Sequence, residues 1–261
     1  MHNVGSAFWV EALKAHRSRM PLFTLLGFSL APLVGGFFMI ILRDVEMARR
    51  IGLISMKAQI VAGTADWPTY LALLAQATAI GGFILFSLVI SWVFGREFSD
   101  RTAKDLLALP TSRTVIVLAK FVVTGVWAGA LVAAICLLGL GVGHAVALPP
   151  TPPGVIAQGL ATVAITAALT IAVTMPIAFF ASAGRGYLPA MGAALLAVIL
   201  AQIVAAVGWG DYFPWAIPAL YAGAARPNYA SLGIASYGIT VATLLIGLAA
   251  TLVWWESADQ S

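Results

Sequence analysis

Long stretches without any charge dominate this chain and limit what it can fold into. Asp, Glu, Lys and Arg are absent from residues 70–94, 121–184, 186–210 and 227–255. Only 9% of the 261 residues are charged, whereas soluble domains carry about 25%. A helix needs roughly 20 apolar residues to cross the hydrocarbon of a bilayer, and it satisfies its own backbone hydrogen bonds there. The sequence therefore predicts an all-α integral membrane protein.

The apolar runs predict six membrane spans. The gaps between them are short and show no strand pattern or core of their own, so residues 1–261 are expected to form a single transmembrane domain. The expected spans lie at about residues 22–42, 67–94, 114–142, 155–181, 188–207 and 229–255.

Residues 1–20 are predicted to form an amphipathic helix that lies in the membrane interface, with Trp9 as its anchor. One helical stripe carries mainly apolar and aromatic side chains, namely Phe8, Trp9, Ala12, Leu13 and His16. The charged side chains lie mostly off that stripe, at Glu11, Lys14, Arg17 and Arg19. The alternative is a frayed tail.

The distribution of basic residues favours cytoplasmic termini. Six spans put both ends of the chain on one side of the plasma (bacterial inner) membrane. With the N-terminus inside, nine Lys and Arg residues lie in cytoplasmic pieces and five in outer pieces. This distribution agrees with the positive-inside rule, although the first outer loop, residues 43–68, carries four of the five.

Two pairs of glycines in the third span predict close helix packing. Gly125 and Gly129 form one small-xxx-small pair, and Gly139 and Gly143 form another. The alternative is the general tolerance of membrane helices for glycine.

The uncharged spans also limit the mechanism. Proton-coupled carriers need titratable groups at depth, and charged ion pathways need charged linings. The three histidines have no neighbouring Cys, Asp or Glu at metal-ligand spacing, and no HExxH or GxSxG motif occurs. We therefore expect no catalytic residue, metal site or cofactor in this chain, and no nucleic-acid partner. A sodium site built from carbonyl and hydroxyl oxygens remains open.

Charge is densest in residues 95–120, which hold five of the fourteen basic residues and three of the ten acids. Ser99 is suited to cap a short helix over about residues 100–109, and Pro110 prevents its continuation. Thr111 or Ser112 is expected to cap the third span. Opposite charges four residues apart stiffen the short helix, in the pairs Glu97–Arg101, Asp100–Lys104 and Arg101–Asp105. On physical grounds alone, an interfacial connector bound to anionic lipid fits equally well.

This stretch resembles the type-2 ABC exporter permeases, most closely their bacitracin- and lantibiotic-resistance-like branch. The family pattern falls here on Glu97, Thr102, Lys104, Leu106, Leu107, Pro110, Ser112, Arg113 and Lys120. Many members have Gly before the Thr, where this chain has Arg101. The opening EALKAHRSRMP and the six-span plan are also similar to the family, so the resemblance covers nearly the whole chain.

The resemblance implies an assembly and a mechanism. Two permease subunits, identical or close paralogues, would pair with two ATP-binding subunits, which bind ATP and Mg. Residues 1–20 would form an elbow helix, and residues 97–109 a cytoplasmic coupling helix seated on the ATPase. ATP-driven closure would then move the first three spans as one body. The coupling residues would be Glu97, Phe98, Asp100, Arg101, Thr102, Lys104, Leu106 and Leu107.

The resemblance further implies an outer gate in residues 208–229, which are rich in aromatic residues, Gly and Pro. Its apolar walls would include Trp209, Tyr212, Phe213 and Trp215. A plain interfacial loop with an aromatic belt is the alternative.

The favoured function is export of an amphipathic or hydrophobic compound, such as a peptide antibiotic, a drug or a lipid-like molecule. Uncharged spans suit a substrate of this kind, which can enter sideways from the membrane. The alternative from another class is a membrane anchor or regulatory subunit that transports nothing. A secondary carrier is disfavoured by the missing charges.

Overall fold

All regular structure in the described part of the chain is helical. The computed structural model describes residues 2–43, 64–100, 102, 111–224 and 232–257. The elements are α1 (His2–Arg17), α2 (Met20–Arg43), α5 (Trp67–Ala77), the π-helical turn η1 (Thr78–Gly82), α6 (Phe83–Ser99), α8 (Arg113–Ala145), α9 (Pro153–Thr174), α10 (Ile177–Ala183), α11 (Tyr187–Ala206), the 3-10 turn η2 (Gly210–Tyr212), α12 (Ile217–Tyr221) and α13 (Ile234–Ser257).

Six helical segments are long and apolar enough to cross a membrane, which confirms the six predicted spans. They are Met20–Arg43, Trp67–Ser99, Arg113–Ala145, Pro153–Ala183, Tyr187–Ala206 and Ile234–Ser257. The second segment joins α5, η1 and α6, and the fourth joins α9 and α10. The fourth bends at Pro176 between its two helices, because proline has no N–H to continue the hydrogen-bond ladder.

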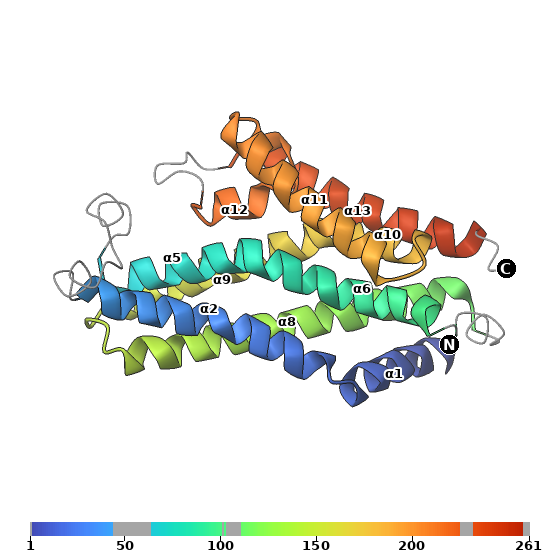
Figure 1. Ribbon diagram of the computed structural model, residues 1–261, viewed down its shortest axis with the longest axis horizontal. Coiled ribbons are helices and arrows are strands. Elements are labelled where there is room, and N and C mark those ends of the chain that lie inside the picture. The colour runs from blue at the N-terminus through green and yellow to red at the C-terminus, as the bar shows by residue number, and fades with distance from the viewer. Residues whose placement is uncertain (1, 44–63, 101, 103–110, 225–231, 258–261) are drawn as a thin grey trace.

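The spans form an elongated bundle with two layers in the view of Figure 1. α2, the continuous segment α5–η1–α6 and α8 run side by side along the long axis, and α10, α11 and α13 lie beside them. α1 lies against α8 at one end of the bundle, and α13 ends at that same end. This arrangement agrees with an even number of crossings. Which end faces the cytoplasm remains a prediction.

Capping side chains fix where two of the spans begin. The Ser112 hydroxyl accepts a hydrogen bond from the Val115 amide, so Ser112 is the predicted cap of the third span, α8. The Asp66 carboxylate accepts one from the Thr69 amide at 2.8 Å at the start of α5. The end of the second span differs from the prediction. α6 continues to Ser99, and the separate helix that Ser99 is predicted to cap lies almost wholly outside the described residues.

Only one of the two glycine pairs in α8 packs closely. A Cβ on Gly139 would lie 2.6 Å from the Leu74 side chain, and one on Gly143 would lie 2.4 Å from the Trp67 ring. Nothing lies within 4 Å of a Cβ built on Gly125 or Gly129 among the atoms compared. The predicted close approach is therefore confirmed for Gly139 and Gly143, where α8 meets α5, and the described residues show none at Gly125 or Gly129.

Candidate functional site

Three helices meet on one buried lysine at the end of the bundle that holds α1. The Lys120 side chain of α8 has no solvent exposure. Its ammonium donates to the Val93 carbonyl of α6 at 2.9 Å and to the Glu97 carboxylate, one turn further along α6, at 2.8 Å. It also donates to the Glu11 carboxylate of α1 at 3.1 Å. One cation thus links α1, α6 and α8.

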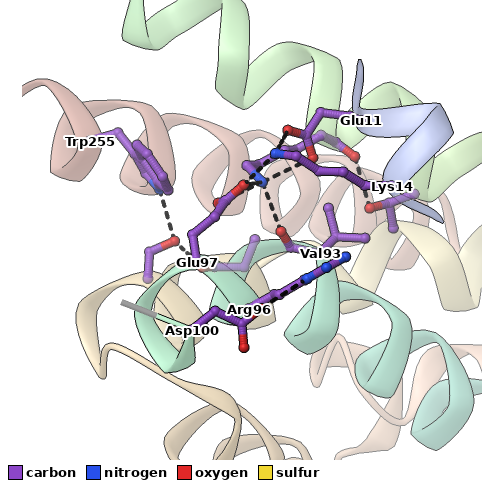
Figure 2. A network of polar contacts seen from close by, with 11 residues as sticks. Glu11, Lys14, Val93, Arg96, Glu97, Asp100 and Trp255 are labelled. Carbon is purple, nitrogen blue, oxygen red and sulfur yellow. Dashed lines mark hydrogen bonds and ion pairs between the residues drawn. The ribbon is translucent and has the colours of Figure 1, made fainter. Parts of the chain in front are cut away.

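A second lysine completes a closed group of charges, which Figure 2 shows. The ammonium of Lys14 on α1 lies 2.7 Å from the Glu11 carboxylate and 3.0 Å from the Glu97 carboxylate. Two ammonium groups and two carboxylates therefore face one another, with no net charge. We call Glu11, Lys14, Glu97 and Lys120 the ion cluster. The net charge of the ion cluster is zero. Removing one member therefore leaves an uncompensated charge in a site that water scarcely reaches.

Burial and partner charges act in opposite directions on the two α1 members. Burial by itself raises the pKa of the Glu11 carboxyl, but Lys120 and Lys14 outweigh it and hold that pKa below its ordinary value. Burial by itself lowers the pKa of the Lys14 ammonium, but Glu97 and Glu11 hold it above its ordinary value. Both groups are therefore charged across the physiological range.

The face that α1 turns inward shares Phe8 and Ala12 with the predicted stripe but also includes Glu11, and it leaves Trp9 and His16 exposed. Glu11 and Ala15 are buried, and Phe8 and Ala12 pack against the core beside them. Trp9 is 66% exposed, which leaves its predicted role as a membrane anchor untested. Glu11 is predicted to lie off the apolar stripe with the other charged residues of α1, and its burial is therefore unexpected. The available signal was the pair of cations, Lys14 on the same helix and Lys120 in the family pattern.

Next to the ion cluster, aromatic and hydrogen-bonding contacts attach the end of α13. The Phe98 ring lies 5.7 Å from both Trp254 and Trp255 between ring centres. The Trp255 indole donates to the Ser182 hydroxyl of α10 at 2.9 Å. Arg113, at the start of α8, donates to the Trp255 carbonyl at 3.1 Å. The last turn of α6 therefore faces charges on one side and the C-terminal helix on the other.

The structure reaches only part of the predicted coupling segment. Glu97 and Phe98 lie in the last turns of α6, and Glu97 faces inward into the ion cluster. Asp100 is exposed and pairs with Arg96 at 3.1 Å, and Thr102 is exposed. The other four predicted coupling residues lie outside the described residues: Arg101, Lys104, Leu106 and Leu107. The coupling helix therefore remains a prediction.

The predicted gate residues gather around η2 and the segment before α12. Trp209 and Tyr212 are both exposed, with ring centres 6.2 Å apart. The ring centres of Phe213 and Trp215 are 5.3 Å apart. The Trp215 indole donates a hydrogen bond of 3.0 Å to the Val173 carbonyl, just before the bend between α9 and α10. Whether this segment opens and closes is untested.

Comparison with known proteins identifies the family. Residues 7–201 match the model of a family described as "ABC-2 family transporter protein". The chain belongs to this family. A similar protein is "Bacitracin transport permease protein BCRB" of Bacillus licheniformis, 26% identical over 179 residues, which are 68% of this chain and 85% of that protein. ABC-2 permeases are non-catalytic transmembrane subunits that pair with ATP-binding subunits.

In this ABC-2 permease, the part of the chain that the structure describes holds no group of three or more His, Cys, Asp or Glu side chains placed to bind a metal. The ion cluster has two carboxylates, but two ammonium groups fill the space between them. Its chemistry is therefore structural, joining helices, instead of catalytic.

Proposed function

We propose that this chain is the permease of an ATP-driven exporter that moves an amphipathic or hydrophobic compound outward. Peptide antibiotics are the first substrates to test, because the similar protein is named a bacitracin transport permease. The uncharged spans support a substrate of this kind, since an ion or sugar would need polar groups along its path. Nine basic residues against five favour a plasma-membrane orientation with both termini in the cytoplasm.

The ion cluster is the observation that carries the proposal. α6 and α8 flank residues 101–110, which hold much of the family pattern, and Lys120 ties both helices to α1. A displacement applied to that segment by an ATPase would enter α6 and α8 together. The three helices would then move as one body. Separating α6 from α8 leaves a buried charge unpaired, and separating α1 from them breaks the Lys14–Glu97 and Lys120–Glu11 ion pairs. Glu97 would transmit force through contacts inside the chain, and Asp100 and Thr102 would face the partner.

The remaining parts of the assembly follow from the family. Two copies of this chain, or one copy and a close paralogue, would pair with two ATPase subunits that bind ATP and Mg. Arg101, Lys104, Leu106 and Leu107 would complete the coupling helix. At the opposite end, Trp209, Tyr212, Phe213 and Trp215 would form an outer gate, supported by the bond from Trp215 to the bend in the fourth span.

The test compares transport, ATP hydrolysis and partner binding in the same vesicles. The permease is co-expressed with its ATPase, and ATP-dependent bacitracin uptake into inverted vesicles is measured. We expect Glu97→Gln to reduce uptake strongly while the ATPase stays bound and keeps its basal hydrolysis. The matched control is Asp66→Asn, which also neutralises a carboxylate but keeps a side chain able to cap α5; it is expected to retain uptake.

Two outcomes would reject the proposal. An ATPase that never co-purifies with the wild-type permease would remove the energy source. An ATPase that binds and hydrolyses, with no uptake of bacitracin or other amphipathic compounds by the wild type, would favour the anchor or regulatory subunit. Unchanged uptake in Glu97→Gln would leave the exporter in place but refute force transmission through the ion cluster.

A further inference from the structure

A groove of about 500 Å³ lies beside the ion cluster, between α1, the start of α2, the end of α6 and the start of α11. Four cationic side chains and one carboxylate line it: Lys14, Arg17, Arg19, Arg96 and Asp100. Apolar side chains, among them Leu13, Phe23 and Trp92, complete its walls. Cations and apolar surface in one groove match a ligand that has an anionic group and a hydrocarbon part.

Two of the four cations have no carboxylate partner in the described residues. Lys14 is compensated by Glu11 and Glu97 in the ion cluster. Arg96 pairs with Asp100 and lies over the Trp92 ring, 5.0 Å from its centre. By contrast, Arg17 and Arg19 are exposed and form no ion pair with a described residue. The groove therefore presents unmet positive charge at the junction of α1 and α2.

The apolar side of the groove continues onto the outer face of α2. Phe23 lines the groove and is 60% exposed. Leu26 and Leu30 follow at helical spacing on the same face, and both are also more than half exposed. A hydrocarbon chain that starts in the groove can thus lie along this row without leaving apolar surface.

We propose that the groove binds an anionic phospholipid. Its phosphate lies between Arg17 and Arg19, and one acyl chain lies along Phe23, Leu26 and Leu30. A volume of about 500 Å³ is within the usual range for small-molecule sites. Because α1 carries Glu11, Lys14 and Arg17, while Arg19 follows at its junction with α2, the bound lipid holds α1 against the bundle. This lipid is a resident ligand, distinct from the exported compound.

The test titrates phosphatidylglycerol into the full chain purified in an uncharged detergent and counts bound lipid by native mass spectrometry. We expect saturable binding, with phosphatidylcholine at least tenfold weaker. An arginine near an anionic lipid contributes about fivefold in affinity. The double variant Arg17→Gln/Arg19→Gln is therefore expected to bind at least tenfold more weakly. Both side chains are exposed, so its unfolding midpoint without lipid is expected to match the wild type.

Two matched variants and one competitor make the test specific. Arg17→Lys/Arg19→Lys keeps the charge and is expected to bind within about threefold of the wild type. Arg185→Gln removes one positive charge at an exposed position between α10 and α11, outside the groove lining, and is expected to leave the affinity for phosphatidylglycerol unchanged. The lipid site would be overturned if the Gln double variant bound phosphatidylglycerol as tightly as the wild type, or if the wild type bound phosphatidylcholine equally well. Full displacement of the lipid by millimolar inorganic phosphate would overturn it in favour of a free-phosphate site.

Discussion

The two ends of α8 are joined to their neighbours by opposite kinds of contact. At the Ala145 end, Gly139 and Gly143 let the Leu74 and Trp67 side chains approach the backbone, with no charge involved. At the Arg113 end, Lys120 holds α1 and α6 through two carboxylates and a carbonyl. The glycine contacts depend on shape and the Lys120 contacts on buried charge, within a single helix. Beyond the glycines, the exposed Arg43 of α2 also donates to the Val146 and Ala147 carbonyls.

The two junctions respond differently to a changed side chain. Apolar packing between membrane helices gains little from excluding water and depends on how well the surfaces fit. A small misfit therefore removes only part of the stability of the junction. Removing one member of a buried ion pair costs much stability at once, because its partner stays buried without compensation. A junction of the second kind suits helices that must move together.

The largest expected effect comes from removing the shared cation. Lys120→Met leaves two buried carboxylates with only Lys14 to compensate them, so we expect a loss of about 3–5 kcal/mol in unfolding free energy. Thermal and denaturant unfolding of the purified permease measure this loss. The double variant Lys120→Met/Glu11→Gln restores neutrality and should recover more than half of it. A cost below about 1 kcal/mol for the single variant would show that charge does not hold this junction.

An added side chain should perturb the other end of α8 less. Gly143→Val places a Cβ within 2.4 Å of the buried Trp67 ring, and we expect a cost of about 1–3 kcal/mol in the same unfolding measurement. Trp67→Ala in the same chain should lessen the clash. The matched control is Gly129→Val, which meets open space in this chain. Equal destabilisation by both valines would argue against shape as the joining principle.

The pH dependence separates the two junctions further. Glu11 has a lowered pKa when folded, so its stabilisation is present above the unfolded value of 4.5 and is lost as pH falls through the folded value. Lys14 has a raised pKa, so its stabilisation is present below the unfolded value of 10.5 and is lost as pH rises through the folded value. We therefore expect these two groups to contribute no slope to the unfolding midpoint between about pH 5 and 10.

Glu11→Gln makes that pH prediction specific to the cluster. Other carboxylates also titrate in acid, so the informative quantity is the difference between wild type and variant. We expect the variant to lose less stability than the wild type as pH falls below 4.5. If the stability curves of wild type and variant superimpose at acid pH, Lys14 and Lys120 do not hold Glu11 ionised.

The smallest expected effect concerns the segment before α12. Trp215→Phe removes the donor to the Val173 carbonyl and should cost about 1 kcal/mol in unfolding free energy. Trp209→Phe is the control, because that ring is 66% exposed and should contribute almost nothing. If Trp215→Phe also leaves transport unchanged, this bond has no part in the proposed gate.

The sequence predicted the spans and one cap because these depend on neighbouring residues. Apolar runs define where a helix can cross, and Ser112 caps its own helix three residues ahead. It did not predict the inward turn of Glu11, whose partner Lys120 is 109 positions away. Nor did it separate the two glycine pairs, which look identical in α8. Only the ring of Trp67, on another helix, distinguishes Gly143 from Gly129.

The most direct test of joint movement is a distance measurement between spin labels in the complex with the ATPase. Cys136, the single native cysteine, is replaced, and cysteines are placed at the exposed positions His16 and Val122, or His16 and Val241, which lies away from the end of α13 that contacts Phe98 and Arg113. Labelled permease is diluted with unlabelled permease, so that distances within one chain dominate. If α1, α6 and α8 move as one body, ATP changes the α1–α13 distance and leaves the α1–α8 distance unchanged. A changed α1–α8 distance would contradict this joint movement.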